Sequence, residues 1–157
     1  MTSECPGCGL MLPAVGGPTH PYVPTSPECW ALFGRTAAKI GHRLLSDAYM
    51  AQHPDGDDPR QLQSVTVHLI TLQAILGDGQ PITTASRITA RAVQLGKVGG
   101  GYPKLERPTT WKSDIRDVAD GNTTAHAFIV DVRAAWDVTE GARIREWTRA
   151  TLESLYA

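Results

Sequence analysis

The sequence predicts a mainly α-helical protein: a helical bundle that carries a loop-rich, zinc-binding module at its N-terminal end. Beyond residue 30, apolar residues recur at spacings of three and four, and no segment there alternates as a half-buried strand does. The first 30 residues are instead rich in proline and glycine and hold all three cysteines. We therefore expect residues 1–30 to form a zinc-knuckle module that packs on a helical domain of residues 31–157, the two folding as one unit.

Size and charge narrow the class of protein. A chain of 157 residues is long enough for one domain whose core needs no disulfides. The net charge is −1, with acids and bases interleaved and no basic block, which argues against a nucleic-acid partner. We find neither a signal peptide nor a membrane-length apolar run, and expect a soluble, cytoplasmic protein without a membrane partner. The sequence does not distinguish whether its partner is a small molecule or another protein.

The first helix should begin at Ser26, a capping residue followed by a proline and an acid. Gly34 and Thr36 predict a break, so we expect two segments, residues 27–34 and 37–52. An apolar stripe runs along the second segment, and Asp47 falls in the middle of it. An aspartate there is costly to bury unless it is paired, ligated or protonated.

Four further helical segments are predicted from apolar spacing and terminal signals: residues 58–76, 84–95, 111–119 and 124–155. The first of these is apolar on nearly all faces and should lie at the centre of the bundle, with His68 within it. The second should stop at Gly96, and Thr110 should cap the third. An interruption of the last segment near Gly141 is left open.

The cysteines predict a zinc site. Cys5 and Cys8 bracket a Pro-Gly pair, a spacing that lets two thiolates bind one ion from the same side. Cys29 falls in the first turn of a predicted helix, where free amides and the helix dipole favour the thiolate. Three thiolates and one imidazole form a common closed, structural zinc set, worth on the order of 10 kcal/mol of folding free energy. The predicted cofactor is therefore Zn²⁺.

The fourth ligand is either of two histidines. We favour His20, because it lies between Cys8 and Cys29 and nearby prolines restrict the conformation of the backbone around it. His53 is the rival, but one straight helix from Cys29 would place it roughly 36 Å away. Only a break near Gly34 would let His53 reach the ion. A redox pair and inert thiols are the other interpretations, although thioredoxin-like motifs need a βαβ pattern that is absent here.

A second candidate site lies among polar residues of the predicted core. If two helices pair antiparallel through the turn at residues 54–58, Asp47 and His68 lie within roughly 3 Å of the same height. Such a pair serves as a general base with its orienting partner, or as two ligands of a second metal completed by His126. A buried polar pair that fixes helix register is the favoured alternative. Tyr49 and His53, one turn apart, would line a pocket mouth, or His53 would simply cap the helix end.

Five segments resemble a family of small bacterial proteins that carry a domain of unknown function. They are Cys5-Pro-Gly-Cys8-Gly, His20-Pro-Tyr22, Ser26-Pro-Glu-Cys29-Trp30, Asp47-Ala-Tyr49-Met-Ala-Gln52-His53-Pro54 and Ser64-Val-Thr-Val-His68-Leu69. The resemblance covers the whole chain, more loosely in its C-terminal half, and implies metal binding through the cysteines but no reaction. Only in architecture is the chain similar to the DinB/YfiT-like metal-dependent bundles, whose histidine pair on the last helix is absent.

Two functions follow from these patterns. The favoured one is a zinc-binding protein of unassigned activity whose ion is structural. The alternative is a metal-dependent enzyme of hydrolase or transferase type, with a pocket around Asp47, His53 and His68 and with Tyr49 beside them. A structural ion requires four protein ligands, whereas a catalytic ion keeps one position open for water.

Overall fold

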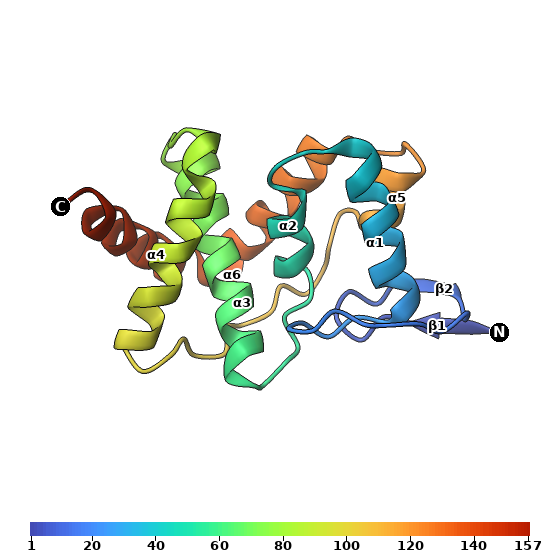
Figure 1. Cartoon of the computed structure of the whole chain (residues 1–157). Helices are drawn as coiled ribbons and strands as arrows, with labels where there is room; N and C mark the ends of the chain where they lie inside the picture. The colour runs from blue at the N-terminus through green and yellow to red at the C-terminus, as the bar shows by residue number, and fades with distance from the viewer.

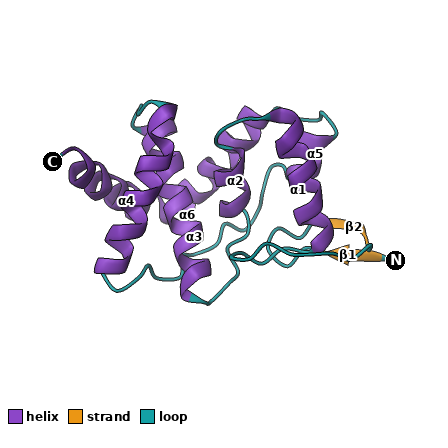
Figure 2. Ribbon diagram, viewed as in Figure 1, coloured by secondary structure: helices purple, strands orange, loops and turns teal.

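The computed structural model describes residues 1–157 as six α-helices and one two-stranded sheet (Figures 1 and 2). The elements are β1 (Thr2–Glu4), β2 (Met11–Pro13), α1 (Pro27–Ile40), α2 (Leu45–Ala51), α3 (Pro59–Leu72), α4 (Ala85–Val98), α5 (Ile115–Ala119) and α6 (Ala125–Tyr156). The predicted mainly α fold is therefore confirmed. No helix is long and apolar enough to cross a membrane.

The N-terminal arm contains a small antiparallel sheet that the sequence analysis did not predict. Strands β1 and β2 pair with Ser3 opposite Leu12. The loop between them is closed by backbone hydrogen bonds from Cys5 N to Leu10 O (2.9 Å) and from Gly9 N to Cys5 O (2.8 Å). This sheet lies beside the start of α1, at the opposite end of the molecule from the C-terminus (Figure 1). The cysteine loop is thus a hairpin turn with defined geometry.

The predicted break near Gly34 and Thr36 is wrong, because α1 continues through both residues. The hydroxyl of Thr36 donates to the carbonyl of Leu32 (2.7 Å), a bond that a helix interior accommodates. The helix ends instead at Gly41, whose φ of 70° is left-handed and whose N–H donates to Ala37 O. Glycine adopts that conformation without the penalty that a side chain incurs. The chain therefore reverses at Gly41, and α2 returns beside the helical body.

Helix α3 is central, as predicted, and packs against α2, α4 and α6. It ends in one π-helical turn, Gln73–Gly77. The long helix α6 passes behind these elements and contributes Trp136, which is 1% exposed and donates its indole N–H to Ala51 O (2.8 Å). This bond fixes the end of α2. Cys5 and Cys29 are buried in the same apolar core as Trp136, so the N-terminal module and the helices share one core.

Two predicted helix boundaries differ from those observed, and the open question of an interruption near Gly141 is answered. Helix α4 continues through Gly96, where an added Cβ would lie 2.4 Å from the ring of Tyr102. Glycine here allows close packing rather than ending the helix. Asp114, not Thr110, caps α5 through a hydrogen bond from Asp117 N (3.1 Å). Helix α6 is continuous through Gly141.

Candidate metal centre

The three cysteines and one histidine meet where the hairpin loop touches the start of α1 and the end of α2. Cys5 and Cys8 lie in the loop between β1 and β2, and Cys29 lies in the first turn of α1. The hydroxyl of Ser26 accepts the amide N–H of Cys29 (3.1 Å), which fixes that turn. His53 follows directly after α2. Three separate segments therefore supply the side chains of the cluster.

Their geometry suits one tetrahedral ion. One ligand atom from each of Cys5, Cys8, Cys29 and His53 lies within 4.8 Å of the other three. The sulfurs of Cys8 and Cys29 are 3.8 Å apart, and the Cys29 sulfur is 3.6 Å from His53 Nε2. Zinc–ligand bonds of about 2.3 Å to sulfur and about 2.0 Å to nitrogen give tetrahedral edges of about 3.8 Å and 3.5 Å. These two separations have the lengths that a bound zinc ion would require.

The imidazole of His53 is oriented by the backbone. Its Nδ1–H donates to the carbonyl of Tyr49, 2.6 Å away and one helical turn earlier. That bond leaves the lone pair on Nε2, the atom that faces the sulfurs. A metal-bound histidine commonly donates its second ring nitrogen to a carbonyl in this way. Since His53 is fully buried, its ring has no competing solvent contact.

Polar hydrogens also point at the sulfurs. The amide of Ser26 donates to Cys5 Sγ (3.4 Å), and the phenol of Tyr49 donates to Cys29 Sγ (3.2 Å). Burial, with the adjacent Cys29, raises the pKa of Tyr49, so its phenol keeps the proton that it donates. Such bonds stabilise negative charge on sulfur. They favour the thiolate form that binds a metal.

The three thiols influence one another strongly. Hydrogen bonds from Cys29 and Cys8 hold the pKa of Cys5 far below its usual range, against the effect of burial. The converse contacts raise the pKa of Cys8, and the contact with Cys5 raises that of Cys29 to about 12. The ionisations of the three thiols are therefore linked, because one thiolate disfavours the next. A divalent cation among them would neutralise the repulsion between three thiolates.

Glycine is required at position 7, between the two loop cysteines. A Cβ there would lie 2.5 Å from His53 Cδ2 and 2.5 Å from the carbonyl oxygen of Pro24. The carbonyl of Gly7 accepts a hydrogen bond from Arg107 Nη2 (2.6 Å), and the same guanidinium contacts Asp55. The sequence analysis missed Arg107, because 100 residues separate it from Gly7 and no local pattern marks the contact.

His20, the favoured fourth ligand, does not join the cluster. Its Nδ1 accepts the amide N–H groups of Tyr22 (2.9 Å) and Val23 (3.2 Å), and its ring packs edge-on against Trp30, with centroids 4.6 Å apart. Burial, followed by the charges of His53 and His68, lowers the pKa of His20 to about 4. The structure thus gives His20 a place in a turn and brings its rival, His53, to the sulfurs.

Asp47 and His68 form the contact that helix pairing predicted. Asp47 Oδ1 lies 2.6 Å from His68 Nδ1, and the guanidinium of Arg43 lies 3.6 Å from the other carboxylate oxygen. The Asp47 side chain is 2% exposed and that of His68 is 19% exposed. His126 does not approach this pair closely enough to complete a three-residue metal site, and its ring faces His42 instead, at 6.3 Å.

The four residues of the predicted pocket do not share one cavity. Of Asp47, Tyr49, His53 and His68, only His68 lines the large cavity of the molecule. Tyr49 and His53 are turned toward the sulfurs, as described above. Gln52, another residue of the quoted motifs, is buried and donates to the carbonyl of Ser113 (2.7 Å). The candidate residues therefore fall into two groups: the sulfur cluster and the Asp47–His68 pair.

Comparison with protein-family models identifies a family for this chain. The model of DUF5946, described as a family of unknown function, matches residues 3–156. The expected membership of an uncharacterised family is thereby confirmed. Neither a curated protein nor a solved structure matches significantly, so the similarity to DinB/YfiT-like bundles stays a prediction.

Proposed function

The chain belongs to DUF5946, a family of unknown function, and we propose that it is a zinc-binding protein whose ion is structural. The ligands in this proposal are Cys5, Cys8, Cys29 and His53. One observation carries it: the four donor atoms of these residues lie within 4.8 Å of one another. Side chains from three segments seldom converge in this way without a shared ligand.

Zinc is the ion that the donor set favours. Thiolates select zinc, copper(I) and iron–sulfur clusters, and an imidazole among three thiolates suits zinc best. The Cys₃His set is one of the common structural zinc sets, and the Cys8–Cys29 and Cys29–His53 separations match tetrahedral edges around zinc. Zinc would supply two positive charges among the three sulfurs, where thiolates would otherwise repel one another.

A structural role is supported by the closed character of the site. Four protein ligands leave no open position for water or substrate. Cys5, Cys29 and His53 are each no more than 1% exposed. The ion would join the N-terminal hairpin to both ends of the α1–α2 unit. Its binding free energy would then add to the stability of the folded state, because the unfolded chain does not hold the four ligands together.

Metal analysis of the purified chain tests this proposal. We expect one equivalent of zinc per chain, and we expect Cys29→Ser to lose both the zinc and much of the thermal stability. A chain that folds fully without bound metal, with three thiols that react freely, would refute a structural zinc.

A metal-dependent enzyme of hydrolase or transferase type is the second candidate. The Asp47–His68 contact favours it, because a buried carboxylate that orients a half-exposed imidazole is a common acid–base arrangement. In this candidate function, Tyr49 and His53 belong to the zinc site and do not contact the substrate. A second equivalent of metal that is lost in His68→Ala would support it.

A further inference from the structure

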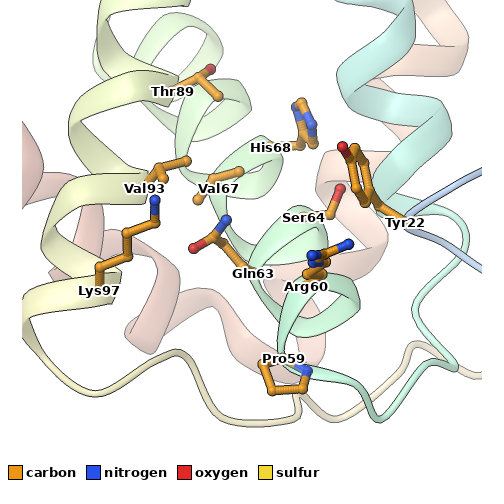
Figure 3. A pocket seen from close by; sticks show the side chains of 10 residues that line it. All are labelled: Tyr22, Pro59, Arg60, Gln63, Ser64, Val67, His68, Thr89, Val93 and Lys97. Atoms are coloured by element: carbon orange, nitrogen blue, oxygen red, sulfur yellow. The ribbon is translucent and has the colours of Figure 1, made fainter.

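The largest cavity lies between α3 and α4, away from the sulfur cluster, and has a volume of about 530 Å³ (Figure 3). Helix α3 forms its central wall, α4 flanks it on one side, and Tyr22 from the N-terminal arm flanks it on the other side, beside His68. Cavities of about 300–1,000 Å³ are typical of small-molecule sites. The cleft is therefore large enough for a metabolite.

The cleft is positively charged, although the chain has a net charge of −1. Arg60 on α3 and Lys97 on α4 both line it, and no aspartate or glutamate does. Neither cation forms a salt bridge within the chain. Gln63 and Ser64 add an amide and a hydroxyl on the α3 wall (Figure 3). Arg60 and Ser64 lie together on the side of α3 that faces Tyr22 (Figure 3), where they can bind an anion. Lys97 adds a second positive charge from α4.

His68 supplies a hydrogen-bond acceptor at one end of the cleft. Its Nδ1–H donates to Asp47, which leaves the lone pair of Nε2 free. Asp47 is buried behind it, and the only hydrogen bond of its carboxylate is to this ring, while Arg43 lies 3.6 Å from its Oδ2, so the carboxylate orients His68. Arg60 and His68 are eight residues apart on α3, or roughly 12 Å along the helix. A ligand that contacts both must be longer than a simple inorganic anion.

We infer that the cleft binds a small phosphorylated molecule that carries hydroxyl groups. Its phosphate binds Arg60 on the side of α3 that carries Ser64 and faces Tyr22. Lys97 adds positive charge from α4, and one hydroxyl donates to His68 Nε2. Arginine and lysine together match a phosphate dianion better than a single-charge carboxylate. The site shares no residue with the proposed zinc ligands, so the inference stands independently of the zinc proposal.

Binding of three probes to the full chain with its native metal content tests the inference. Inorganic phosphate, glucose 6-phosphate and acetate are titrated while amide and side-chain NMR signals are recorded. We expect the sugar phosphate to bind tighter than phosphate, acetate to bind far more weakly, and cleft residues to shift. Arg60→Gln should weaken binding about tenfold, and Lys97→Gln should weaken it less, because Lys97 acts from the other side of the cleft. Arg87→Gln, an exposed cation of α4 that does not line the cleft, is the matched control.

His68→Phe tests the hydroxyl contact, since it should abolish the advantage of glucose 6-phosphate over phosphate. If that variant fails to fold, His68→Asn provides the same comparison, because its amide donates to Asp47 but reaches less far. The inference is overturned if neither phosphate compound shifts the cleft signals, if acetate binds as tightly, or if Arg87→Gln weakens binding as much as the cleft variants. An undiminished preference for the sugar phosphate without His68 overturns the role of that histidine.

Discussion

Nε2 of His53 lies 3.6 Å from Sγ of Cys29, although 24 residues separate them. Helix α1 carries the chain away from Cys29, Gly41 reverses it, and α2 returns it to the start of α1. Trp136 then holds the end of α2 through the carbonyl of Ala51. The cluster therefore closes only when the hairpin loop, the α1–α2 reversal and α6 are all in place.

Replacement of the two competing histidines should distinguish the fourth ligand. We expect His53→Ala to lose bound zinc, because only three ligand atoms would remain. His20→Ala should keep one zinc per chain, since His20 bonds to backbone amides instead. Metal content by mass spectrometry decides between them. Retained zinc in His53→Ala, with loss in His20→Ala, would reverse our assignment.

Gly7→Ala should lower the free energy of unfolding by about 1–3 kcal/mol, because the new methyl group collides with His53 and the Pro24 carbonyl. Chemical denaturation measures the change. Gly34→Ala is the control, since nothing lies within 4 Å of a Cβ there and the position is helical. This control substitution should leave the free energy of unfolding unchanged or raise it by about 0.5–1 kcal/mol. Equal effects of the two substitutions would contradict the close contact at Gly7.

Asp47→Asn should destabilise the fold by about 1–3 kcal/mol, because it weakens a charge-assisted hydrogen bond to His68 in a buried site. Zinc content should not change, since Asp47 is not a ligand. Asp57→Asn removes a carboxylate that is 82% exposed and should cost about 0–1 kcal/mol. If Asp47→Asn releases metal, the two sites are not separate.

Zinc removal should destabilise the wild-type chain by several kcal/mol, because an ion that binds only the folded state stabilises that state against unfolding. A thermal melt with and without a strong chelator measures this effect, and added zinc should restore the original transition. The His53→Ala variant should melt at one temperature under both conditions. A wild-type melt that is insensitive to the chelator and to zinc would argue against a structural ion.

The sequence predicted the helical class, the central position of α3 and the convergence of three cysteines, because periodicity and C-x-x-C spacing are local signals. The choice between His20 and His53 depended on which glycine ends α1. Gly34 lies within the helix at a cost of about 1 kcal/mol, which packing elsewhere offsets. Gly41 ends it because its φ is positive, and residue type alone does not separate the two cases.

Contacts between residues that are far apart in the sequence could not be predicted from local sequence patterns either. Gly96 is a packing site for Tyr102 rather than a helix end, and that ring is brought there by a loop. Arg107 donates a hydrogen bond to Gly7, although 100 residues separate the two in the sequence. The Asp47–His68 contact, in contrast, was predictable because a short turn joins two helices whose lengths set the register.

X-ray absorption at the zinc edge tests the central claim most directly. Purified protein should give one zinc with three sulfurs at about 2.3 Å and one nitrogen at about 2.0 Å, without an oxygen ligand. The nitrogen contribution should disappear in His53→Ala. A coordinated water in the wild-type protein, or a spectrum unchanged by that substitution, would contradict a closed structural site built from Cys5, Cys8, Cys29 and His53.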